Sequence, residues 1–397
     1  MFGIKRVWFV LLGLFFFFFI TTRNGVAGKV AGKWVEKKDS VSLRHEVQHA
    51  IDRGLQYLEG KQAPGGYWSQ AEYPALTGLC LTAFMRDPSG RIKAKPPLCV
   101  KKGYEYLLKN VKPDGGIYVH DLSNYNTSVC MMALVVAYNP SYEPVLRKAR
   151  NFLAGLQDES ADGGGDAKYA GGIGYGGSSG HSDITNTMYA LEAIYYTRFL
   201  ASDKGRDHSG VKKLDWPAAI RFIERCQNLP GSNDQPWASG DAQNKGGFVY
   251  FPGKSMAGEM KLPSGRTALR SYGSASYSGL LSYIYADMRR DDPRVKMAYD
   301  WLMKNYTLDE NPGMGPAGLY YYYHTMAKAL STYGTDKISL PGGKIVDWRK
   351  QLALKLLNLQ REDGSWGNEN GRWWERDPVL VTSYSVMTLE IIYKGLN

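Results

Sequence analysis

The sequence predicts an all-α protein, a single (α/α)6 toroid of six helix-pair repeats. Two observations carry this prediction. A unit of two helical segments, joined in most copies by a Gly-Gly-aromatic turn, recurs six times along the chain. The first segment of each unit is apolar on one face, whereas the second is apolar nearly all round. The first segments therefore suit an outer layer and the second segments an inner, buried layer.

Composition narrows the classes of protein. With 44% hydrophobic and 22% charged residues, the 397-residue chain is typical of a globular protein rather than a disordered one. The formal charge is +11, but no Lys/Arg-rich run occurs in the sequence, so we expect no nucleic-acid partner. Scattered basic charge is compatible with peripheral contact with an anionic membrane. The four cysteines are too few for a disulfide scaffold, and whether Cys99 pairs with Cys80, Cys130 or Cys226 stays open.

The amino terminus has the pattern of a secretory signal peptide over residues 1–28. Two basic residues precede an apolar run, Val7–Ile20, which is short for a bilayer span, and small residues follow at 26–28. We expect a secreted or periplasmic protein, with an uncleaved membrane anchor as the alternative. Residues 29–40 are expected to form a linker and residues 41–397 the toroid.

The expected outer helices each carry an apolar stripe. Ala149, Phe152, Leu153 and Leu156 show the i, i+3, i+4, i+7 spacing. The six segments are centred on residues 50–58, 103–108, 149–153, 219–223, 298–302 and 352–360.

The expected inner helices begin near residues 74, 125, 182, 271, 319 and 378. Because every outer-to-inner connection has the same sense, the inner helices run parallel and their N-termini share one mouth of the ring. Helix N-termini carry free N–H groups and partial positive charge, so we expect polar or anionic ligand groups at that mouth.

The fourth repeat contains an insertion, residues 230–270, at the same mouth. Its segment 246–253 predicts a hairpin, and Arg266 and Arg270 make it basic. Long loops over binding sites are often lids. We therefore interpret the insertion as a basic lid, with a structural flap as the alternative.

The last turn, Gln360–Trp366, carries a family resemblance. It resembles the Gln-x-x-x-Gly-x-Trp repeat of squalene and terpenoid cyclases, and the Gly-Gly-aromatic turns are similar to those of protein prenyltransferase β subunits. The resemblance covers essentially the whole chain after the signal peptide. It implies an α/α toroid with an apolar central cavity and isoprenoid ligands.

The catalytic acid of class II terpenoid cyclases is the middle Asp of Asp-x-Asp-Asp. The matching segment here is Asp183–Thr187, and the acid position is Thr185, whose hydroxyl cannot protonate an alkene. Asp183 with His181 is a second possible acid pair. The alternative is that Asp183 caps the inner helix.

The zinc set of protein prenyltransferases is also incomplete. His324 matches the histidine ligand, but segment 271–277 supplies neither the carboxylate nor the thiolate that Zn²⁺ requires. We therefore expect no metal and no cofactor, and we keep His324 as a candidate catalytic residue.

Residues at the starts of the inner helices and in the loops above them are the candidate ligand contacts. Alignment of the inner helices puts Asn126, Asp183 and Tyr322 at one level, with Thr185 and His324 one layer deeper. The candidates for ligand binding are Asn126, Thr185, Asn186, Arg266, Arg270, Tyr272, Tyr322, Trp373 and Tyr384.

These features favour an exported toroid that binds an isoprenoid or another apolar molecule, with incomplete catalytic motifs. If it is an enzyme, we expect a variant terpenoid cyclase or prenyltransferase-like reaction. Two alternatives remain. A non-catalytic scaffold for a protein or peptide would have a filled centre, and a carbohydrate-active (α/α)6 enzyme would have paired carboxylates across a groove.

Overall fold

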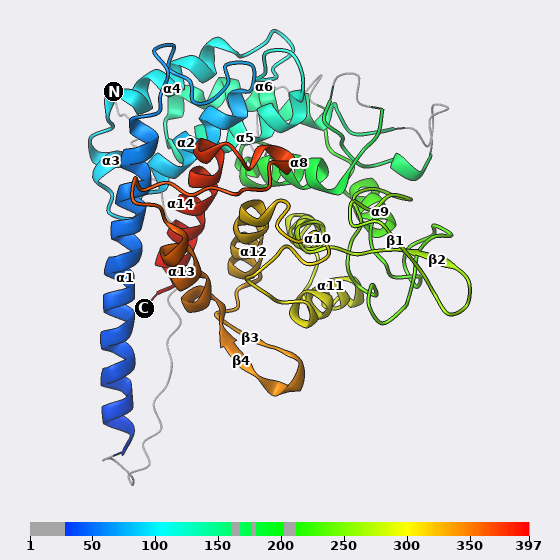
Figure 1. The fold of residues 1–397 in the computed structure, drawn as a ribbon. Coiled ribbons are helices and arrows are strands. Elements are labelled where there is room, and N and C mark those ends of the chain that lie inside the picture. Colours follow the sequence, from blue (N-terminus) through cyan, green and yellow to red (C-terminus); the bar gives the residue numbers. More distant parts are fainter. Residues whose placement is uncertain (1–27, 160–166, 177–179, 202–211, 397) are drawn as a thin grey trace, which may run out of the picture.

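A computed structural model describes residues 28–159, 167–176, 180–201 and 212–396. Six inner helices form a closed ring, because each contacts its neighbours and the last contacts the first. They are α2 (Pro74–Arg86), α5 (Ser123–Val136), α8 (Ile184–Tyr196), α10 (Gly273–Tyr285), α12 (Leu319–Tyr333) and α14 (Pro378–Gly395). The predicted all-α toroid is confirmed (Figure 1).

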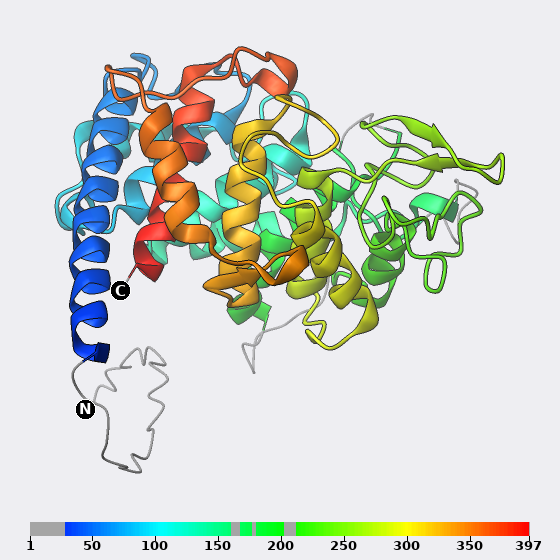
Figure 2. The same ribbon diagram turned by 60° about the horizontal axis from the view of Figure 1, so that its bottom comes forward.

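The outer helices alternate with the inner ones along the chain. They are α1 (Gly28–Glu59), α4 (Leu98–Lys109), α6 (Glu143–Ala154), α9 (Trp216–Arg225), α11 (Pro293–Lys304) and α13 (Trp348–Leu359). Helix α1 packs against α13 and α14, so the first and last repeats meet, and its start extends beyond the ring (Figures 1 and 2).

Short elements fill the connections. They are α3 (Arg91–Ala94), η1 (Pro140–Tyr142), η2 (Ala167–Tyr169), η3 (Arg198–Ala201), η4 (Pro341–Gly343) and η5 (Arg372–Trp374). Two antiparallel pairs, β1 (Glu259–Lys261) with β2 (Thr267–Leu269) and β3 (Lys337–Ser339) with β4 (Ile345–Asp347), form small hairpins.

Two expectations about local structure differ from the structure. Residues 29–40, expected as a linker, continue α1, since this segment contains no proline and its polar residues are compatible with a helix. In the insertion the hairpin is β1–β2, whereas segment 246–253 forms only isolated bridges, Phe248 with Gln227 and Phe251 with Lys254. Phe248 and Val249 are both buried, so their neighbouring side chains do not alternate between core and solvent as in a strand. The segment is a packed loop.

Several further predictions concern the amino terminus, the membrane and the cysteines. The expected signal peptide, residues 1–28, lies outside the described residues except for Gly28. Export therefore stays a prediction, and so does the alternative of an uncleaved membrane anchor. The mass and location of the mature chain would distinguish them. Among the described residues no helix is long and apolar enough to cross a membrane.

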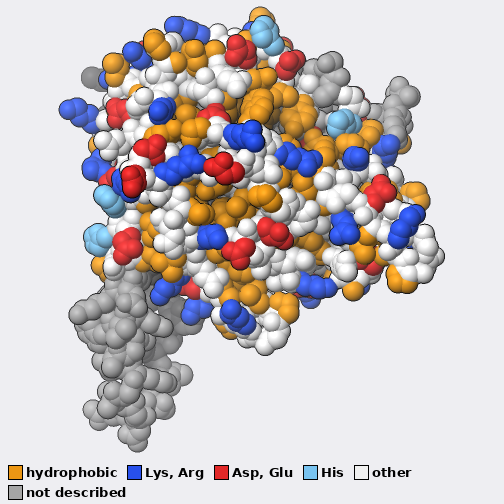
Figure 3. All heavy atoms as spheres, viewed as in Figure 1, with side chains coloured by type: hydrophobic (Ala, Val, Ile, Leu, Met, Phe, Trp, Pro, Cys, Tyr) orange, Lys and Arg blue, Asp and Glu red, His pale blue; other side chains and the backbone are white. Residues whose placement is uncertain are grey.

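On the face in Figure 3, basic side chains are dispersed among acidic and apolar ones. All four cysteines are buried free thiols.

Each Gly-Gly turn is held between its own inner helix and the next outer helix. In the fourth repeat, Gly246 has φ +93°, and a Cβ there would overlap the carbonyl oxygen of Met297 in α11. The backbone N–H of Phe248 donates to Ser276 in α10 at 3.0 Å. Glycine is required here both for the positive φ and for the close approach.

We predict that Gly246→Ala costs roughly 3 kcal/mol or more in the free energy of unfolding, because it adds a steric overlap to the strain of a positive φ. Gly253→Ala is the matched control: its φ is +89°, but its Cβ would meet open space. The control should lose only about 1 kcal/mol. Urea unfolding of both variants checks this, and equal losses would show that the close approach to α11 does not matter.

Candidate functional site

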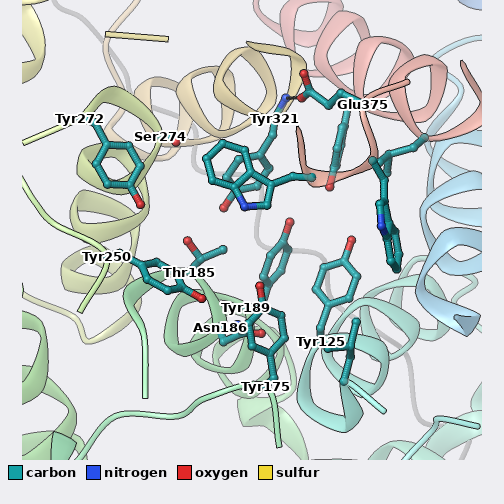
Figure 4. A pocket seen from close by; sticks show the side chains of 15 residues that line it. Tyr125, Tyr175, Thr185, Asn186, Tyr189, Tyr250, Tyr272, Ser274, Tyr321 and Glu375 are labelled. Atoms are coloured by element: carbon teal, nitrogen blue, oxygen red, sulfur yellow. Dashed lines mark hydrogen bonds between the residues drawn. The ribbon is translucent and has the colours of Figure 1, made fainter. Parts of the chain in front are cut away.

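A cavity of about 310 Å³ lies where the inner helices begin. We call it the tyrosine cavity, because seven tyrosines and two tryptophans are among its fifteen lining residues. They are Leu122, Tyr125, Tyr175, Thr185, Asn186, Tyr189, Tyr250, Tyr272, Ser274, Tyr321, Trp373, Trp374, Glu375, Leu380 and Tyr384. In Figure 4 the labelled tyrosine rings reach this space from several different elements.

Four phenols form the interior of the cavity wall. The rings of Tyr125 and Tyr189 meet edge to face, with centroids 5.2 Å apart, and those of Tyr321 and Tyr384 lie 5.9 Å apart. The Tyr321 hydroxyl lies 3.2 Å from that of Ser278, within hydrogen-bond distance. Burial raises the pKa of Tyr321 to about 12, so this phenol is neutral. With these four rings in it, the wall presents mainly aromatic carbon to the cavity.

The N-termini of several inner helices are capped by side chains of neighbouring repeats. The N–H of Ala75 in α2 donates to Asn126 at 2.9 Å, and the N–H of Ser274 in α10 donates to Asn311 at 3.0 Å. The N–H of Tyr321 in α12 donates to Glu375 at 2.8 Å. These donors were expected to be free for a ligand; they are not, because the neighbouring carbonyl and carboxylate oxygens occupy them.

Asp183 is the N-cap of α8. Its carboxylate accepts hydrogen bonds from the backbone N–H groups of Thr185 and Asn186, at 3.0 and 2.9 Å, and from the Asn186 side chain at 2.7 Å. Burial raises the pKa of Asp183 to about 6, while hydrogen bonds from Asn186 and Tyr250 oppose that rise. Asp183 does not line the cavity, although Asn186 and Tyr250 do.

Two tryptophans form an exposed edge of the cavity. Trp373 and Trp374 are 41% and 40% exposed, and both have a positive φ, 54° and 64°. This conformation costs a non-glycine residue about 1 to 2 kcal/mol, and such strain is concentrated at functional sites. Trp373 packs closely over Gly318, and Trp374 packs against Tyr73 with centroids 4.6 Å apart. The fold thus holds both indoles at the entrance.

Glu375 is the only carboxyl group among the lining residues. One oxygen accepts the Tyr321 N–H and the other accepts the Asn368 amide at 2.6 Å. Burial raises its pKa, and these hydrogen bonds oppose the rise. Glu375 therefore holds the tryptophan segment against the start of α12.

The structure brings five predicted ligand contacts to the cavity: Thr185, Asn186, Tyr272, Trp373 and Tyr384. Four others lie outside it. Asn126 caps α2, and the Tyr322 hydroxyl donates to the Thr307 carbonyl at 2.9 Å. Arg266 and Arg270 bind carbonyl groups within the insertion, at Pro236 and Glu259. The alignment of α12 was off by one residue, since Tyr321 faces the cavity and Tyr322 points toward the outer layer.

The two histidines lie beside the cavity rather than in its wall. His181 packs against Phe251 with centroids 4.4 Å apart, and burial lowers its pKa. No hydrogen bond joins it to Asp183 within the described residues, so the predicted acid pair is not assembled. His324 stacks on Tyr384 at 5.5 Å, and burial, then Lys328 and Arg86, hold its pKa well below the usual value. The described residues hold no cluster of three or more metal-ligand side chains.

Tyr175, Tyr189, Tyr250 and Glu375 were missed as lining residues. Tyr189 lies one turn after Thr185 on the same helix, so helical periodicity could have found it. The other three lie outside the inner helices, where periodicity carries no information.

Comparisons with known proteins place this geometry in context. No family model matches the chain. Squalene–hopene cyclase of Bradyrhizobium diazoefficiens is 26% identical over 234 residues, which cover 51% of this chain and 33% of that enzyme. The chain thus spans about a third of the length of this relative.

Solved structures match over most of the chain. A variant of the type II terpene cyclase MstE from Scytonema, in complex with the product merosterolic acid A, superposes with a TM-score of 0.54. It is 10% identical, and the match covers 89% of this chain and 99% of that one. Another variant, in complex with the substrate geranylgeranyl dihydroxybenzoate, has the same TM-score and identity and covers 90% and 99%. The chain has a terpenoid cyclase-like fold. In this toroid the tyrosine cavity lies at the inner-helix starts.

We predict that Asp183→Asn changes how the stability of this terpenoid cyclase-like toroid depends on pH. The folded pKa of Asp183, about 6, exceeds its ordinary value of 3.8. Its contribution to stability is therefore full below about pH 4 and is lost as the pH rises through 6. Because asparagine keeps the cap but does not titrate, the variant should gain on the order of 3 kcal/mol relative to the wild type between pH 4 and pH 8.

Urea unfolding at each pH measures this difference. Asp183→Ala, which also removes the cap, should be less stable than Asp183→Asn throughout the range. A difference between wild type and Asp183→Asn that stays constant with pH would contradict the raised pKa.

Proposed function

We propose that the tyrosine cavity binds a short isoprenoid chain. The observation that carries the proposal is the wall itself, in which nine of fifteen lining residues are aromatic. Such a wall offers a large apolar contact surface to a ligand. Burial of the ligand's apolar surface then contributes about 25 cal/mol per Å².

The size of the cavity supports a short chain. Its volume of about 310 Å³ is near the lower end of the range for small-molecule sites, roughly 300 to 1,000 Å³. A longer chain would extend past the exposed indoles of Trp373 and Trp374. The complexes of MstE with geranylgeranyl dihydroxybenzoate and with merosterolic acid A support the same class of ligand.

The alternatives have less support. A glycosidase needs two carboxyl groups facing each other, whereas the lining residues include only Glu375, whose two oxygens hold Tyr321 and Asn368. A scaffold with a filled centre does not account for a cavity at this mouth. We also expect no cyclisation of the bound chain, because no lining carboxyl is available as an acid.

We predict that the double variant Trp373→Ala, Trp374→Ala binds geranylgeraniol at least tenfold more weakly than the wild type. It removes two of the nine aromatic side chains of the wall but should lose little stability, because both indoles are already about 40% exposed. Binding is measured by isothermal titration calorimetry, and unfolding by heat checks the fold. Phe199→Ala, at an aromatic residue 50% exposed in η3, is the control and should bind like the wild type.

The ligand recovered after incubation is then analysed by mass spectrometry and chromatography. We expect the recovered ligand to be unchanged geranylgeraniol. Equal affinity in all three proteins would contradict the binding site, and conversion to a cyclic isomer would contradict binding without chemistry.

A further inference from the structure

A second cavity, of about 510 Å³, lies at the opposite mouth of the ring, where the inner helices end. All six inner helices contribute to its wall. Four of its lining residues are basic, Arg86, Lys93, Lys328 and Lys394, and we call it the basic cavity. It shares no lining residue with the tyrosine cavity.

The acidic residues in this wall already have partners. Glu192 pairs with Lys328 at 2.5 Å, and both side chains are nearly buried. Asp87 accepts hydrogen bonds from the Gln48 side chain at 3.0 Å and from the Ser89 N–H at 3.1 Å. Glu192 is thus matched by Lys328, whereas the partners of Asp87 are neutral, so Asp87 offsets only one of the other three cations and the wall keeps an excess of basic groups.

Glu390 lies behind the wall and leaves the same charges uncompensated. It is completely buried, and neither of its oxygens has a hydrogen-bond partner within the described residues. Burial raises its pKa well above the usual value, although Arg86 and Lys394 oppose that rise. Glu390 therefore forms no ion pair or hydrogen bond with either cation among the described residues.

Arg86 and Lys394 repel each other across the basic cavity. The pKa of Lys394 is lowered by burial first and then by Arg86; Glu390 opposes this lowering, and Lys93 adds to it. Neither Arg86 nor Lys394 forms an ion pair in the described part of the chain, whereas Lys93 lies over the Tyr138 ring, 4.0 Å from its centroid. Converging cations that outnumber the acidic groups beside them cost free energy, which a bound anion would recover.

The favourable interaction of cations with helix C-termini explains only part of this clustering of basic side chains. Arg86 and Lys394 stand near the ends of α2 and α14, where cations are favourable. Lys93 comes from the short helix α3, however, and Lys328 from the middle of α12. The hydroxyls of Ser331 and Thr332 in the same wall add hydrogen-bond donors.

We propose that the basic cavity binds a phosphate-class anion, held by Arg86, Lys93 and Lys394. Either a free diphosphate or the phosphate of a lipid headgroup supplies the oxygens that this set of donors recognises. The site is independent of isoprenoid binding, since it lies at the other end of the ring.

The first test uses inorganic diphosphate as the probe. Calorimetry should show binding to the wild type and at least tenfold weaker binding to the double variant Arg86→Gln, Lys394→Gln. The matched control, Lys101→Gln with Lys102→Gln, removes two exposed cations from α4 and should bind like the wild type. Without diphosphate the double variant should melt at the same temperature or higher, since it loses a repulsion.

The second test separates the two sources of phosphate. Sedimentation compares binding to phosphatidylglycerol vesicles and to phosphatidylcholine vesicles for the same three proteins. A loss of phosphatidylglycerol binding confined to the Arg86/Lys394 variant would assign the site to a lipid headgroup, and a diphosphate effect alone would assign it to a free anion. If neither probe distinguishes that variant from the control, the proposal is wrong.

Discussion

The structure depends on one repeated set of hydrogen bonds, in which a glutamine side chain joins the turn to the next outer helix in four of the six repeats. Gln62, Gln157, Gln227 and Gln360 each donate to a carbonyl in their own Gly-Gly turn and to a carbonyl at the next outer helix. For Gln360 that helix is α1, so the same contact closes the ring. A threonine or serine of the inner helix then accepts the N–H after the turn, as Thr382 does from Trp366 at 3.1 Å. Together these bonds place the starts of the inner helices around one mouth.

This arrangement gives the two mouths of the ring different chemistry. At the starts of the inner helices, side chains such as Asn126, Asn311 and Glu375 occupy backbone N–H groups. The cavity between them is consequently aromatic and largely without free charge. At the ends of the inner helices, Arg86, Lys93 and Lys394 converge around a polar cavity. From the sequence we expected polar or anionic ligand groups at the first mouth. The excess of basic side chains lies at the second mouth instead.

The architecture was predictable because the signals for it are local and repeated. Helical periodicity and the turns located the inner-helix starts to within two residues, including Pro74, Leu319 and Pro378. The site was predictable only in part. Which of Tyr321 and Tyr322 faces the cavity depends on a rotation of about 100° about α12. Tyr250 and Glu375 come from irregular segments, whose positions are set by long-range contacts such as the Asn368–Glu375 hydrogen bond.

The most direct test of the account locates a bound isoprenoid within the chain. A photoreactive diazirine analogue of geranylgeraniol is bound to the protein and irradiated, and the labelled peptides are identified by mass spectrometry. The account predicts that label falls on the starts of α8, α12 and α14 and on the Trp373–Trp374 segment, and that unlabelled geranylgeraniol prevents it. Label confined to the outer helices or to the β1–β2 hairpin, or label that excess geranylgeraniol does not displace, would contradict the account.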